Sequence, residues 1–95
     1  MKNLVILSLA LSPAAAFAHG TLPIQASNAI ASAAQVFSTT QAPEVRRQFF
    51  AIGAEVAGHE RFAVTVTLKD KVTQFKYDCV ENEDVEPVVW ECAAL

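Results

Sequence analysis

Basic residues, long hydrophobic runs and catalytic motifs are all scarce in this chain of 95 residues. Seven basic residues stand against ten acidic ones. This balance argues against nucleic acid as a partner, because its recognition needs a basic patch, and it predicts repulsion from an anionic membrane surface. Beyond the first 18 residues no stretch is apolar enough to span a bilayer, which takes about 20 residues.

The motifs that usually carry catalysis are missing as well. The chain has no G-x-S-x-G, no H-E-x-x-H and no C-x-x-C. Beyond residue 18 the only serines are Ser27, Ser32 and Ser38, which fall in or just after a predicted helix. His59 and Glu60 are adjacent in sequence, and neighbours on a turn do not form an orienting triad. We therefore expect a protein that is not an enzyme and uses no cofactor.

Residues 1–18 have the pattern of a secretory signal. Lys2 supplies the positive charge, residues 4–11 form a short apolar run, and residues 16–18 fit the A-x-A cleavage pattern. No cysteine stands directly after the predicted cut, so we expect no lipid anchor there. The sequence predicts a periplasmic or secreted protein whose single small domain is residues 19–95.

Cys79 and Cys92 are the only cysteines. An even number of cysteines in an exported chain predicts a disulfide. The bond would close a loop of about 14 residues and add about 3 kcal/mol of stability in the chain-entropy model. A domain of this size buries only about 60% of its unfolded surface, so such a bond matters. A thiolate metal site would need further ligands nearby.

The first element of the domain is predicted to be a helix. Thr21 is placed as its N-cap and Pro23 lies in its first turn. Residues 24–37 follow, and residues 38–43 are a connector. Helical spacing puts one apolar stripe on this helix, formed by Ala26, Ile30, Ala33 and Phe37.

Residues 44–58 fit two patterns. As a helix, capped by Thr40, they share a face formed by Val45, Phe49, Ile52 and Val56. As a strand, they alternate through Phe50, Ile52, Ala54 and Val56. A hairpin with residues 58–60 as its loop favours the strand, because every partner is then apolar. The expected pairs are Val56–Phe62, Ala54–Val64, Ile52–Val66 and Phe50–Leu68.

Three further strands are predicted at 61–68, 71–79 and 87–92. Lys69 and Asp70 are expected to form a two-residue turn, giving the pairs Val66–Thr73, Val64–Phe75 and Phe62–Tyr77. On the last strand Val88, Trp90 and Cys92 share one face, so Cys92 meets Cys79 on the neighbouring strand. The predicted fold class is α+β: one N-terminal helix packed on a four-stranded antiparallel meander, with one disulfide.

The segment 80–87, VENEDVEP, is the first candidate site. Its acids are Glu81, Glu83, Asp84 and Glu86, and the predicted disulfide closes its base. Closing a loop lowers the entropy lost on binding, so this loop suits a basic protein partner. Small periplasmic inhibitors of hydrolases use rim loops in a similar way. The alternative is a solvated loop whose charges discourage edge pairing.

The stretch RFAVTVTLKDKVTQFKYD, residues 61–78, is similar in rhythm to the central hairpin of PepSY-type periplasmic domains, in which a helix also precedes antiparallel strands. The leading hypothesis is a small exported protein without enzymatic activity. It would bind an envelope or extracellular protein, as an inhibitor or a PepSY-like module.

The predicted mature N-terminus is the second candidate site. Its start, His19-Gly20, resembles the mature start of lytic polysaccharide monooxygenases and of some periplasmic copper carriers. That resemblance implies a copper ion held by the α-amine and imidazole of His19, with His59 as the second imidazole. The alternative is an N-terminal histidine left by processing and a His59 that is an ordinary turn residue.

Mass spectrometry of the exported protein tests the processing and the copper hypothesis together. We expect a chain that begins at His19 and lacks two hydrogens because of the disulfide. On the copper hypothesis it takes up one Cu(II), and a variant with one extra residue before His19 loses that affinity. Equal copper binding by both proteins would contradict an N-terminal site.

Overall fold

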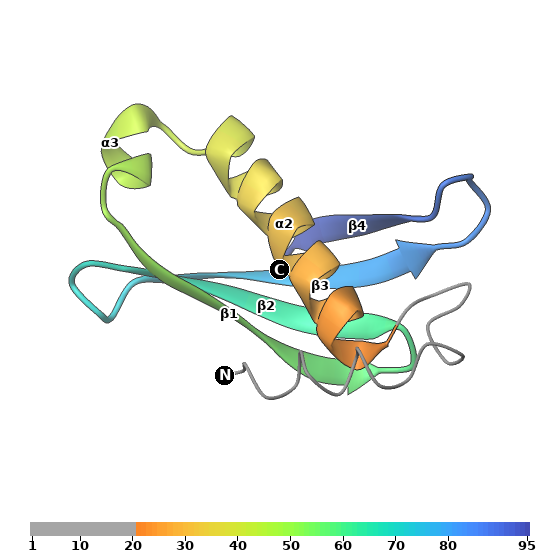
Figure 1. Ribbon diagram of the computed structural model, residues 1–95. Coiled ribbons are helices and arrows are strands. Elements are labelled where there is room, and N and C mark those ends of the chain that lie inside the picture. Colours follow the sequence, from red (N-terminus) through yellow and green to blue (C-terminus); the bar gives the residue numbers. More distant parts are fainter. Residues whose placement is uncertain (1–20) are drawn as a thin grey trace.

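A computed structural model describes residues 21–95, so the predicted signal and His19 lie outside the described residues. A helix packs on one face of a four-stranded antiparallel sheet in the order β1-β2-β3-β4 (Figure 1). This confirms the predicted fold class. The elements are α2 Leu22–Thr40, α3 Pro43–Arg46, β1 Phe49–Gly58, β2 Arg61–Leu68, β3 Gln74–Asn82 and β4 Val89–Ala94.

Helix α2 begins after Thr21, as predicted, although the Thr21 side chain makes no capping hydrogen bond. Its buried residues are Gln25, Ala29, Ala33 and Phe37. The predicted stripe is therefore right for Ala33 and Phe37, whereas Ala26 and Ile30 are only partly buried beside it. The buried row repeats every fourth residue, and its two central alanines let the helix lie close to the sheet.

The core lies between α2 and the inward face of the sheet. Strand β2 supplies every second residue to it, and the buried set there is Phe62, Val64, Val66 and Leu68. Tyr77 and Trp90 extend the core across β3 and β4. The Phe62 and Trp90 rings lie 5.6 Å apart, a distance typical of favourable aromatic pairs.

Residues 44–58, whose sequence fits both a helix and a strand, begin in a short helix and continue as a strand. Pro43–Arg46 forms one short helix, and Phe49–Gly58 forms strand β1. The preferred strand is confirmed for the central pairs Ile52–Val66, Ala54–Val64 and Val56–Phe62. The outermost pair is wrong, because a register shift between Phe49 and Ala51 places Phe49, not Phe50, opposite Leu68.

The turn between β1 and β2 is shorter than predicted. Gly58 pairs with Arg61, which leaves only His59 and Glu60 in the turn. Glu60 has φ 53°, a left-handed conformation that residues with a Cβ adopt less readily than glycine.

The register of β2 and β3 differs from the prediction by two residues. Val66 lies opposite Phe75, Val64 opposite Tyr77, and Phe62 opposite Cys79. A shift of two keeps each side chain on the predicted face, because strand side chains alternate with a period of two. The predicted Lys69-Asp70 turn is therefore wrong, although Phe75, Tyr77 and Cys79 lie on the predicted inward face. Thr73, predicted on that face as well, is exposed in the loop before β3.

Asp70 explains the longer connection. Its carboxylate accepts hydrogen bonds from the backbone N–H groups of Val72 and Thr73, both at 2.8 Å, and from the Thr73 hydroxyl at 2.6 Å. The Leu68 N–H then donates to the Thr73 carbonyl at 3.0 Å and closes the hairpin. Lys71 takes φ 64° inside this loop.

The same three hydrogen bonds make Asp70 a pH-sensitive group. The bond from the Thr73 hydroxyl, followed by the two backbone bonds, holds the pKa of Asp70 below its ordinary value of 3.8. A carboxyl with a lowered pKa stabilises the folded state above its unfolded pKa. That contribution disappears as the pH falls through its folded pKa.

We expect Asp70→Asn to lower the free energy of unfolding at neutral pH. The difference from the original protein should shrink as the pH falls from about 5 to about 2. Chemical denaturation across this range measures it, and a carboxyl NMR titration reports the Asp70 pKa directly. Asp84→Asn is the matched control at an exposed loop position. A constant difference at every pH would contradict the prediction.

Candidate functional site

Acidic side chains gather where two connections of the meander lie at the same end of the sheet. The β1–β2 turn and the β3–β4 loop share this end, and α3 and the β2–β3 loop lie at the other (Figure 1). Glu60 from the turn meets Glu81 and Glu83, and one carboxylate oxygen from each lies within 4.8 Å of the other two. We call residues 58–61 and 80–88 the acidic end.

Glu81 and Glu83 are among the predicted binding residues, whereas Glu60 is predicted only as a turn residue beside His59. A backbone hydrogen bond places Glu60 beside the loop, because the Glu81 N–H donates to the Glu60 carbonyl at 3.2 Å. Only the strand order places a turn residue beside a loop some twenty positions later. The predicted meander was the signal from which Glu60 could have been found.

The loop itself is held at its base. Strand β3 continues to Asn82, whose side-chain amide donates to a Glu91 carboxylate oxygen on β4 at 2.9 Å. The Asn82 side-chain oxygen accepts from the Asp84 N–H, also at 2.9 Å. Glu83, Asp84 and Glu86 are exposed, whereas Glu81 is half-buried. Three of the four predicted binding residues therefore face solvent from an anchored loop.

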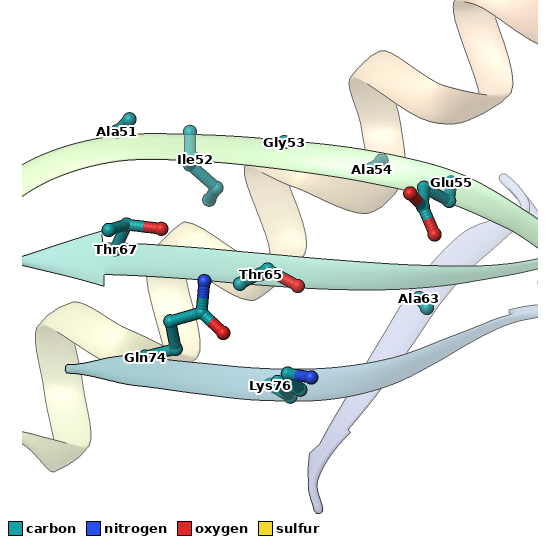
Figure 2. A pocket seen from close by; sticks show the side chains of 10 residues that line it. All are labelled: Ala51, Ile52, Gly53, Ala54, Glu55, Ala63, Thr65, Thr67, Gln74 and Lys76. Atoms are coloured by element: carbon teal, nitrogen blue, oxygen red, sulfur yellow. The ribbon is translucent and has the colours of Figure 1, made fainter. Parts of the chain in front are cut away.

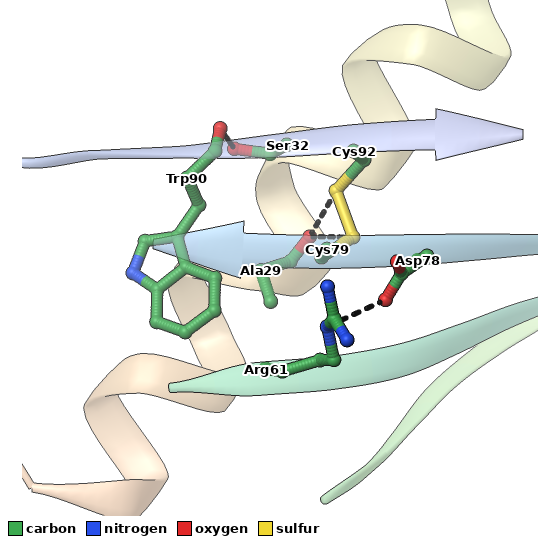
Figure 3. Close-up of a disulfide and its surroundings, with 7 residues drawn as sticks. All are labelled: Ala29, Ser32, Arg61, Asp78, Cys79, Trp90 and Cys92. Carbon is green, nitrogen blue, oxygen red and sulfur yellow. Dashed lines mark hydrogen bonds and ion pairs between the residues drawn. A yellow bond between two sulfur atoms is a disulfide. The ribbon is translucent and has the colours of Figure 1, made fainter. Parts of the chain in front are cut away.

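The predicted disulfide joins Cys79 and Cys92, which lie directly opposite each other on β3 and β4. Both sulfurs contact the carbonyl oxygen of Ala29 on α2, at 3.8 and 3.6 Å (Figure 3). A disulfide sulfur has no hydrogen to donate, so these are packing contacts. Nearby, the Ser32 hydroxyl donates to the Trp90 carbonyl at 2.9 Å. The bond therefore fastens the acidic loop to the core beneath the helix.

Arg61 is the single basic residue within the ranges that define the acidic end. Its Nε lies 3.3 Å from a carboxylate oxygen of Asp78 on β3 (Figure 3). Both side chains are at least one-third exposed, so the pair contributes about 1 kcal/mol or less. Arg61 is thus paired across to the neighbouring strand, and the acids of the acidic end outnumber it five to one.

His59 lies at the tip of the β1–β2 turn, as predicted, and its side chain is 91% exposed. Its Nε2 is 3.6 Å from a carboxylate oxygen of Glu60. The other proposed copper ligand, His19, lies outside the described residues. The copper site that combines the two stays a prediction.

A shallow depression of about 550 Å³ crosses the open face of the sheet, the face away from α2 (Figure 2). It is not among the sites predicted from the sequence. Small residues of β1 and β2 form its floor, and Glu55, Gln74 and Lys76 supply polar groups. None of its lining residues is a histidine, cysteine or serine, so it lacks the usual pairing of nucleophile and base.

No family model, curated protein or solved structure matches the chain. Among residues 21–95, no helix is long and apolar enough to cross a membrane. The function therefore has to be argued from the arrangement of the side chains.

Removing the disulfide tests its part in holding the acidic loop. We expect Cys79→Ala combined with Cys92→Ala to lower the free energy of unfolding by about 2–5 kcal/mol, because the unfolded chain regains its freedom. Denaturation measures the loss, and hydrogen exchange should show faster exchange at residues 80–91. The reduced original protein is the matched control and should behave like the double variant. Unchanged stability in both would contradict a structural role for the bond.

Proposed function

We propose that this chain is a small exported protein without enzymatic activity that binds a basic surface of another envelope or extracellular protein. The acidic end is the binding surface. The observation that carries the proposal is the convergence of Glu60, Glu81 and Glu83 beside the exposed acids of an anchored loop.

Carboxylates at this spacing give the acidic end a concentrated negative charge, which attracts a cationic partner. Two unit charges about 4 Å apart interact by about 4 kcal/mol at the effective dielectric of a protein surface. An Arg or Lys side chain of a partner, placed beside the cluster, adds an attraction of the same order. Complementary charge also speeds encounter and suppresses wrong partners.

The loop is also suited to binding because it is already ordered. The disulfide, the Asn82–Glu91 hydrogen bond and the backbone bond from Glu81 to Glu60 all hold its base. A loop held in this way loses less conformational entropy when a partner docks. An inhibitor that inserts a rim loop into a basic cleft is one form of such binding, and a PepSY-like binding module is another.

Export is the remaining part of the proposal. The signal pattern of residues 1–18 supports it, and a disulfide in a small domain is typical of oxidising compartments. The same compartment, periplasmic or secreted, is where a basic envelope partner would be met.

A photocrosslinking residue at Val85, in the acidic loop, tests the proposal in the producing cells. We expect a specific adduct from Val85, and Glu83→Lys combined with Asp84→Lys should reduce its yield about tenfold or more, because like charges then face the partner. The yield should also fall as salt is raised.

Two controls separate this effect from general changes. A crosslinker at Val72, which is exposed at the other end of the sheet, should not give the same adduct. Glu44→Lys combined with Glu55→Lys changes the net charge equally but leaves the acidic end intact. An adduct that survives reversal of Glu83 and Asp84 would refute binding through the acidic loop.

A further inference from the structure

Strand β1 forms one edge of the sheet and is long and apolar. Among the described residues only β2 pairs with it, and none of them pairs along its other side. Its ten residues, FFAIGAEVAG, include a single charge, Glu55, and no proline. Proteins usually protect such edges with short strands, lysines or prolines.

The opposite edge of the sheet is protected in these ways. Strand β4 has six residues, begins shortly after Pro87 and carries Glu91. It also lies against α2 through the Ser32–Trp90 hydrogen bond. Strand β1, by contrast, has no buried residue, and Phe50 and Val56 are 51% and 61% exposed.

Charge is distributed unevenly along β1. Just before it lie Arg46 and Arg47, and the β2–β3 loop adds Lys69 and Lys71 at the same end. We call these four residues the basic end; Glu44 and Asp70 lie there too, so four cations stand against two carboxylates. The Lys71 ammonium lies 4.8 Å from the centre of the Phe50 ring, and the Lys69 N–H donates to the Gln48 carbonyl at 2.7 Å. The basic end is therefore packed against the start of β1. The last residue of β1, Gly58, leads directly into the acidic end.

We propose that two copies of this chain pair through β1, antiparallel, around a two-fold axis at Gly53. This orientation sets the basic end of each copy beside the acidic end of the other, whereas parallel pairing would set like charges together. A two-fold at Gly53 places Phe50 opposite Val56 of the second copy, and Ile52 opposite Ala54. The two exposed apolar side chains then cover each other, and the strands form one continuous sheet.

The pairing leaves room for the proposed function. Strand β1 and the β3–β4 loop belong to opposite edges of the sheet, so the loop stays accessible in each copy. Glu60 lies nearer the junction, and the loop acids Glu83, Asp84 and Glu86 lie farther away. Failure of one proposal therefore does not imply failure of the other.

Gly53→Cys tests the pairing and its register. No atom lies within 4 Å of a Cβ added at Gly53, so the substitution fits the single chain. In the proposed dimer the two new cysteines face each other directly, at a spacing that a disulfide bridges. We expect mild oxidation to give a covalent dimer in high yield. Thr65→Cys, on the same face of the inner strand β2, is the matched control and should give at least about tenfold less dimer.

Val56→Lys tests the same interface without new cysteines. It places a lysine against Phe50 and Lys71 of the second copy, so the dimer dissociation constant should rise about tenfold or more. Val89→Lys, the same change on the opposite edge strand, should leave the constant unchanged. Sedimentation equilibrium of the purified protein measures both. A monomer at about 1 mM, or equal crosslinking from positions 53 and 65, would overturn the proposal.

Discussion

The burial of one face of β2 beneath α2 is the constraint on which the rest of this structure depends. Four alternate side chains of that strand are buried, and its two neighbours are selected by the need to continue the same apolar surface. A slip by one residue would turn this face to solvent and is strongly disfavoured. A slip by two residues leaves the same side chains facing the core. Burial therefore determines which face of each strand points inward more firmly than it determines which residues pair across the strands.

This difference explains which parts of the fold could be predicted from the sequence. The alternation of β1 and β2 was enough to identify the central pairs of their hairpin, because all six side chains there are small or apolar. The partners of β3 were misplaced by two residues, because they depend on hydrogen bonds from Asp70 that no hydrophobic pattern encodes. The register shift between Phe49 and Ala51 is likewise a local irregularity of the backbone that the hydrophobic pattern does not encode. On α2, Gln25 was missed because a polar residue breaks an apolar stripe even where it is buried.

The candidate site was predictable to a similar degree. The four loop acids and the disulfide that closes the loop follow from local sequence and from the pairing of two strands. Glu60 does not, because it joins the cluster only through the order of strands in the sheet. The separation of basic and acidic residues to opposite ends of β1 also depends on the order of the strands. Neither the arginines before the strand nor the lysines of the β2–β3 loop are unusual in sequence, but antiparallel topology collects them at one end.

The burial of the disulfide is unequal. Cys79 has no exposed surface beneath α2, whereas Cys92 on the outer strand is half-buried. Thiol–disulfide exchange requires an external thiolate to reach one particular sulfur. Of the two residues only Cys92 has exposed surface in the folded protein, so exchange there would attack the Cys92 sulfur with Cys79 as the leaving group. Exchange at this bond would therefore have a direction: an external thiolate would form its mixed disulfide with Cys92 on β4, and the Cys79 thiolate would be released beneath α2.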